Sequence, residues 1–188
     1  MRCLLFALFC SVPVAAQSDP LPVRFLPGGA GAEGCYAQWS TRSAVRAYSA
    51  PTESSRHLRT IDGERRIDAN DYSESLTAVL EPGLLRFRQP AEIEGTRLST
   101  GQTETVPLSI NDELVVLSAG PDESVYFAFG GGVFAGAVPG FYGGDHAEMV
   151  RQPVTEVWVR LVEHGEDRPA SWINTAQAGM APREPFCE

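Results

Sequence analysis

The chain has 188 residues, of which 43% are hydrophobic and 21% charged, and its formal net charge is −9. This composition is typical of a folded globular protein and excludes a disordered or collagen-like chain. The acidic balance argues against a nucleic-acid partner, because a surface that neutralises phosphates needs a basic stripe. All 15 basic residues are arginine, which excludes chemistry that needs a Schiff-base or phosphate-binding lysine.

The beginning of the chain has the pattern of a secretory signal peptide, residues 1–16. Arg2 precedes an apolar run from Cys3 to Val14, and Ala15 and Ala16 are the small residues that a signal peptidase requires. The run is shorter than the about 20 apolar residues of a membrane-spanning helix. We therefore expect cleavage after Ala16, a secreted or periplasmic location and no membrane span.

The cysteines are expected to stabilise the processed protein. Removal of residues 1–16 leaves Cys35 and Cys187, and an oxidising compartment favours their pairing. We expect a disulfide bond that joins the two ends of the fold, with two buried free thiols as the alternative. In the chain-entropy model, a loop of this length stabilises the folded state by about 5 kcal/mol.

The stretch from Pro20 to Gly34 is rich in Pro and Gly, and residues 17–43 are expected to form an extended N-terminal arm. The body then contains short runs of β-branched, aromatic and other apolar residues bounded by Gly, Pro, Asn, Asp or Ser, which is the pattern of strands. Apolar residues do not repeat with a sustained helical period. The predicted strands are 44–48, 58–61, 65–68, 76–80, 84–87, 93–98, 114–117, 125–129, 133–138, 157–162 and 171–174.

These elements predict an all-β fold. Short antiparallel strands with regularly spaced turns favour one or two small barrels, because closure removes bare sheet edges. A change of composition near Gln89 and Pro90 divides the body into a first unit, residues 44–90, and a second unit, residues 91–188. Each unit is small for an independent core, so packing between them and the terminal disulfide would stabilise both.

A glycine-rich segment extends from Gly130 to Gly144. Neither a Walker motif nor a dinucleotide fingerprint accompanies these glycines, so we expect no nucleotide and no cofactor. Gly130 to Gly132 are expected to turn a hairpin, where positive φ is needed. The rest of the segment is a predicted loop insertion that carries Phe141 and Tyr142, either as exposed ligand-binding aromatics or as packing against the core.

Three segments share features with one family of small barrels. Val45–Pro51 reads as a short strand that runs into a Pro/Ser turn, Ile110–Leu117 as a strand after a polar turn, and Val157–Leu161 with Ser171–Asn174 as a closing hairpin. These segments resemble bacterial SH3-like (SH3b) domains, although Ser171 stands where that family usually has glycine. The resemblance implies SH3-like barrels in a secreted bacterial protein that binds cell-wall or protein ligands and is rarely catalytic.

No catalytic residue is predicted. The three histidines lie in polar, turn-like segments, and the sequence contains no zinc motif and no Gly-x-Ser-x-Gly elbow. His146 adjoins Asp145 and precedes Glu148 by two positions, an arrangement that allows a metal or general-base site. A hydrolase centred on His146 is therefore an alternative, while our expectation is a protein without metal, cofactor or enzyme activity.

The preferred hypothesis is a secreted or periplasmic SH3-like binding module for a cell-envelope or protein ligand. Its candidate ligand-binding residues are Phe141, Tyr142, Trp158 and Trp172, large aromatic side chains that either form a binding face or pack in the core. Another alternative is an acidic inhibitor or immunity-type protein that masks a basic exported hydrolase, because acidic surfaces speed association with basic targets.

The disulfide can be checked by mass spectrometry. Alkylation of the non-reduced, processed protein should modify neither Cys35 nor Cys187, because an oxidised sulfur has no thiolate to react. After reduction, both cysteines should be modified. Two alkylated cysteines in the non-reduced protein would show that they are unpaired.

Overall fold

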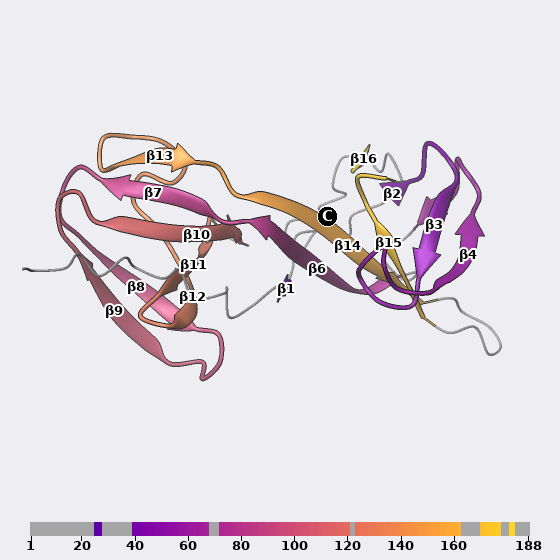
Figure 1. Ribbon diagram of the computed structural model, residues 1–188, viewed down its shortest axis with the longest axis horizontal. Helices are drawn as coiled ribbons and strands as arrows, with labels where there is room; N and C mark the ends of the chain where they lie inside the picture. The colour runs from indigo at the N-terminus through magenta and orange to yellow at the C-terminus, as the bar shows by residue number, and fades with distance from the viewer. Residues whose placement is uncertain are drawn as a thin grey trace, which may run out of the picture.

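The computed structural model describes residues 25–27, 39–67, 72–120, 123–162, 170–177 and 181–182. The predicted signal peptide, Cys35 and Cys187 lie outside these residues. Within them the chain forms strands and turns and no helix (Figure 1). The predicted all-β class is confirmed.

Most strands are short, and two long ones lie in the middle of the molecule (Figure 1). The strands are β1 (Phe25–Pro27), β2 (Trp39–Ser40), β3 (Val45–Tyr48), β4 (His57–Ile61), β5 (Arg66–Ile67), β6 (Tyr72–Glu81), β7 (Gly83–Phe87), β8 (Ala91–Arg97), β9 (Thr103–Leu108), β10 (Glu113–Ala119), β11 (Val125–Phe129), β12 (Gly132–Gly136), β13 (Ala147–Arg151), β14 (Val154–Leu161), β15 (Ser171–Asn174) and β16 (Ala181–Pro182).

A six-stranded sheet has the order β1-β6-β14-β15-β3-β4. Its two longest strands, β6 and β14, are antiparallel neighbours that pair from Glu81 opposite Val154 to Tyr72 opposite Leu161, with register shifts at Val154/Thr155 and Arg160/Leu161. β15 lies between β14 and β3, so segments from the two ends of the chain become neighbours. A small three-stranded sheet, β16-β2-β5, lies at the same end of the molecule (Figure 1).

A seven-stranded sheet has the order β13-β7-β10-β11-β12-β8-β9. Only residues 109–112 join β9 to β10, although these strands are far apart in that order, so the sheet must curl until β9 returns towards β10. Val106 and Leu108 of β9 accordingly share one core with Leu114 of β10. Among the described strands no backbone pairing joins β9 to β10, so this sheet is rolled without being closed.

The seven-stranded sheet is an insertion within the six-stranded one. Residues 83–151 form it alone, while the strands on either side of this segment, β6 and β14, pair with each other. The β6–β7 connection and the β13–β14 connection lie close together: at the end of β13, Arg151 Nε donates a hydrogen bond to the Pro82 carbonyl oxygen at 2.9 Å. A Cβ atom at Gly83 would lie 2.7 Å from Pro153 Cδ, so only glycine permits this approach.

The predicted division into units 44–90 and 91–188 does not coincide with the two large sheets. Gln89 and Pro90 lie in the turn between β7 and β8, inside the seven-stranded sheet. The six-stranded sheet combines β3, β4 and β6 with β14 and β15. The two differ because β6 pairs with β14 across the inserted residues 83–151, and a change of local composition gives no information about such long-range pairing.

The two sheets have separate cores and one shared junction. At the junction, Leu26 of β1 and Val79 of β6 pack against Leu117, Tyr126 and Val133 of the seven-stranded sheet. The Tyr126 hydroxyl donates to the Pro27 carbonyl oxygen at 3.0 Å. Burial of these side chains favours a fixed arrangement of the two sheets, because apolar surface is removed from water on both sides.

Several predicted elements are confirmed. The hairpin turn at Gly130 and Gly131 joins β11 to β12, and both residues have positive φ angles, 54° and 75°. The strand predicted at 171–174 has the bounds of β15. The structure adds β9, β13 and β16, which the sequence patterns did not predict, and it adds β1 and β2 within the predicted N-terminal arm.

Two glycines allow β8 and β12 to approach each other closely. Gly95 lies opposite Gly136, above the stacked rings of Phe127 and Phe134, whose centroids are 5.5 Å apart. A Cβ atom at Gly95 would lie 2.9 Å from Phe127 Cζ, and one at Gly136 would collide with the Glu94 carbonyl oxygen. The close packing of β8 against β12 in the rolled sheet therefore requires glycine, which has no Cβ atom, at positions 95 and 136.

Gly136→Ala should destabilise the protein by about 1–3 kcal/mol, the usual cost of overpacking, because a backbone oxygen cannot move aside as a side chain can. Urea unfolding followed by circular dichroism measures the change. Thr96→Ala, at an exposed position of β8, is the control and should leave the midpoint nearly unchanged. Equal midpoints for Gly136→Ala and the wild type would contradict the close approach.

Candidate functional site

Phe141 and Tyr142 lie in the loop between β12 and β13. Their rings form an edge-to-face pair with centroids 4.7 Å apart. Phe141 packs against the core of the rolled sheet, whereas Tyr142 is 63% exposed and its hydroxyl donates to the Ser124 carbonyl oxygen at 3.2 Å. Desolvation, and secondarily the charge of Glu123, raises the pKa of Tyr142 above its ordinary value. Because Phe141 packs against the core and Tyr142 is mostly exposed, Phe141 is the residue that anchors this loop.

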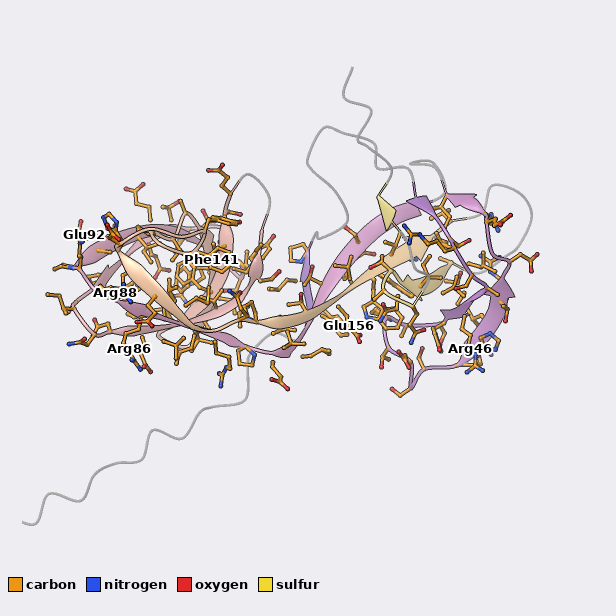
Figure 2. All side chains as sticks on the ribbon, turned by 90° about the horizontal axis from the view of Figure 1, so that it is seen from above. Arg46, Arg86, Arg88, Glu92, Phe141 and Glu156 are labelled. Carbon is orange, nitrogen blue, oxygen red and sulfur yellow. The ribbon has the colours of Figure 1, made fainter. Side chains whose placement is uncertain are left out.

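Trp158 and Trp172 lie in the other sheet, on β14 and β15. Both are buried and cluster with Tyr48, whose ring meets that of Trp158 edge-to-face at 6.0 Å. The structure therefore does not bring the four predicted aromatic residues together. Figure 2 shows Phe141 within the seven-stranded half, away from Glu156, which is two residues before Trp158 on β14.

The residues around His146 do not converge on a site. The His146 side chain is exposed, and the neighbouring carboxylate of Glu148 is engaged by Arg88 Nη2 at 3.0 Å. Within the described part of the chain, no group of three or more His, Cys, Asp or Glu side chains is placed to hold a metal ion.

A pocket of about 180 Å³ lies beside Trp158 and is here named the Trp158 pocket. Its apolar wall comes from β1, β6 and β14, and its other wall from the loop between β3 and β4. The Ser55 hydroxyl donates to the carbonyl oxygens of Ala50 and Thr52, which fixes the shape of that loop. The lining residues are Phe25, Pro51, Thr52, Glu53, Ala78, Leu80, Glu156 and Trp158.

The described residues that line the Trp158 pocket include two carboxylates and no cationic side chain. Glu156 is half-buried and has no hydrogen bond or ion pair among the described residues. Glu53 is exposed and accepts a hydrogen bond from the Gln177 side-chain amide. An apolar wall with negative charge at its rim suits a basic group carried on an apolar stem.

Trp158, which lines this pocket, carries a buried donor without a hydrogen-bond partner among the described residues. Trp158 is 1% exposed, and its indole Nε1 has no hydrogen-bond partner in the part of the chain that the structure describes. Buried indole N–H groups are usually paired, because leaving one unpaired costs free energy. A buried group of this kind calls for an explanation, and a bound water molecule is one that would satisfy it.

The second hollow, here named the β1 groove, has a volume of about 510 Å³. It lies between β1 and the tips of two hairpins and is lined by Phe25, Pro27, Arg97, Leu98, Ser99, Gly131, Gly132 and Val133. Its wall is mostly apolar, and Arg97 is the charged side chain among these residues. The Arg97 guanidinium stacks on Phe134, 4.5 Å from the ring centroid, and forms two hydrogen bonds to Glu104, at 2.5 and 2.8 Å.

Charge is distributed unevenly between the two halves. Residues 39–67 contain six arginines against three acidic residues, whereas residues 83–151 contain four arginines against nine acidic residues. Figure 2 shows Arg46 at one end of the molecule and Glu92 at the other. The seven-stranded sheet therefore carries most of the negative charge of the described chain.

Trp158 was predicted from the sequence as a candidate ligand-binding residue, whereas its neighbours in the pocket were not. Glu156 precedes Trp158 by two positions on a strand, and side chains two apart share one face, so this residue had a usable signal. Phe25 and Glu53 had none, because their proximity to Trp158 depends on strand pairing and on a loop from distant parts of the chain.

Comparisons with protein-family models, with curated proteins and with solved structures found no match to this chain. Among the described residues, no helix combines the length and apolar character that a membrane crossing needs.

The ion pair at the β1 groove predicts a pH-dependent stability. The hydrogen bond from Arg97, and secondarily its charge, holds the pKa of Glu104 below its ordinary value of 4.5. A lowered carboxyl pKa stabilises the folded state above the ordinary value, and this contribution is lost as the pH falls through the lowered pKa. Glu104→Gln should therefore be less stable than the wild type at neutral pH, and the difference should vanish in acid.

Urea midpoints measured from neutral pH to about pH 3 test this prediction, since that range spans the ordinary carboxyl pKa. The control is Glu92→Gln on β8, an exposed position for which the described residues show no ion pair. A constant difference between Glu104→Gln and the wild type at every pH would show that the ion pair does not stabilise the fold.

Proposed function

We propose that this protein is a non-catalytic binding module that takes a basic group of a protein or cell-envelope ligand into the Trp158 pocket. The observation that carries the proposal is the Glu156 carboxylate, which lines the pocket together with Phe25, Leu80 and Trp158 and has no hydrogen bond or ion pair among the described residues. The candidate binding site thereby moves from the four predicted aromatic residues to Trp158 and the residues around it.

The chemistry of the pocket favours a guanidinium or ammonium group. A cation near Glu156 and Glu53 gains Coulomb energy and charge-assisted hydrogen bonds, while its methylene stem covers the apolar wall. An aromatic ring beside a cation adds a cation–π attraction. A carboxylate or phosphate ligand would instead meet like charge at the rim.

We further propose that the six-stranded sheet is the SH3-like unit of an exported protein. The pairing of β3 with β15, and of β15 with β14, supports this, because the first and last segments that resemble SH3b domains then lie side by side. The third such segment, Ile110–Leu117, lies in the seven-stranded sheet and adds no support. Export rests on the signal pattern of residues 1–16.

A second candidate function is the acidic inhibitor or immunity-type protein. The excess of acidic residues in residues 83–151 favours it, since the negative charge of this half of the molecule would attract a basic hydrolase by long-range steering. The two candidates place the contact on different sheets. In the first, Glu156 contacts the ligand, and in the second, exposed acids such as Glu92 do.

Two charge-matched variants, Glu156→Gln and Glu92→Gln, distinguish the candidates. Calorimetric titration of the processed protein with a blocked arginine-containing peptide should show about tenfold weaker binding for Glu156→Gln, because a charge-assisted hydrogen bond contributes about 1.5 kcal/mol or more. Glu92→Gln should bind the peptide as the wild type does.

The same titration with a basic lysozyme-like hydrolase tests the second candidate. Binding that weakens with Glu92→Gln and with added salt, and that is unaffected by Glu156→Gln, would favour the inhibitor. If the wild type binds neither the peptide nor the hydrolase, both candidates are wrong.

A further inference from the structure

The Trp158 pocket and the β1 groove share one wall. Phe25 lines both hollows, and each hollow then continues onto a different sheet: the pocket onto β6 and β14, and the groove onto the tips of the β8–β9 and β11–β12 hairpins. Figure 1 shows β1 in the middle of the molecule, between β6 and the seven-stranded sheet. A ligand that fills both hollows must therefore pass the Phe25 ring.

The shared wall is firmly placed. Phe25 lies opposite Ala78 in the pairing of β1 with β6, and Ala78 lies opposite Glu156 in the pairing of β6 with β14. The next residue, Leu26, is fully buried in the junction between the sheets. Phe25 therefore stands in one row with the carboxylate of the pocket, and the position of β1 defines the step between the hollows.

The two hollows differ in the chemistry that they accept. The pocket presents Glu53 and Glu156 and suits a cation. In the groove, the charge of Arg97 is neutralised by Glu104, and Leu98 and Val133 supply apolar surface. Leu98 is 36% exposed, so a ligand group that covered it would remove apolar surface from water. The groove therefore suits an uncharged apolar group.

We propose that the two hollows are adjoining subsites for an extended peptide segment of a basic protein partner. A basic side chain enters the Trp158 pocket, the peptide passes Phe25, and an apolar side chain of the same segment covers Leu98 in the β1 groove. This inference rests on the proposed function, since it assigns a basic group to the Trp158 pocket. It adds the seven-stranded sheet to the recognition surface.

The choice of a peptide follows from charge and continuity. Negative charge at one subsite and a neutral apolar surface at the next call for a ligand that carries a basic group beside an apolar one, and an extended peptide can present two such side chains to separate pockets. Two subsites on one chain of ligand also strengthen binding, because the second group binds at a high effective concentration once the first is held.

The test uses blocked hexapeptides and the full processed protein. One peptide contains a single arginine among alanine and glycine residues, and a second series adds one leucine at one to four positions from the arginine. We expect one spacing to bind at least about fivefold more tightly than the arginine-only peptide, because an apolar side chain gains free energy on burial. Titration calorimetry measures the dissociation constants.

Leu98→Ala should abolish the gain from leucine and leave the affinity for the arginine-only peptide unchanged. The matched control is Ile110→Ala, an aliphatic residue in the turn between β9 and β10 that is 56% exposed and is not among the residues found to line either hollow, which should preserve the gain. Glu156→Gln should weaken every arginine-containing peptide.

The inference is overturned if no leucine spacing improves on the arginine-only peptide, or if the gain survives Leu98→Ala. In either case binding of the arginine-only peptide would leave the proposed function intact. The absence of binding by every peptide would contradict both. A dimer in sedimentation that Leu98→Ala dissociates would also overturn the inference, since it would assign the groove to a second copy of the chain.

Discussion

The antiparallel pairing of β6 with β14 is the constraint on which the rest of the structure depends. These neighbouring strands are the two longest of the six-stranded sheet, and they also hold both ends of the segment that forms the seven-stranded sheet. One residue separates β6 from β7, and two separate β13 from β14, so the inserted sheet begins and ends at the same place. A shift in this register would move Glu156 and Trp158 away from Ala78 and would separate the walls of the pocket.

The junction around β1 is the second support, and it links architecture to recognition. Leu26 anchors a strand of only three residues between the sheets, and the residues on either side of it, Phe25 and Pro27, line the hollows. Because the neighbours of a buried strand residue point to the opposite face, burial of Leu26 directs Phe25 towards the hollows. Burial of Leu26 in the interior thus fixes the positions of Phe25 and Pro27, which shape the hollows at the surface.

Local patterns predicted much of this fold, and long-range pairing accounts for what they did not predict. Runs such as Ser171–Asn174 and the Gly130–Gly131 turn carry their conformation in their own residue types, so the all-β class and several strands were predictable. β9 has the sequence TETVPL, whose polar alternation and proline suit an edge strand and hide it from an apolar pattern. At the site, Trp158 was named from its size, whereas Glu53 joins it only through the tertiary fold.

The distribution of tryptophan gives the two halves different optical signals. All three tryptophans, Trp39, Trp158 and Trp172, belong to the six-stranded and three-stranded sheets, and residues 83–151 contain none. Indole emission therefore reports on the half of the molecule that contains the tryptophans. In residues 83–151 the fluorescent side chains are instead Tyr126, Tyr142 and the weakly emitting phenylalanines. Coincident unfolding curves from indole fluorescence and from backbone dichroism would mean that the inserted sheet and its host lose their structure as one cooperative unit.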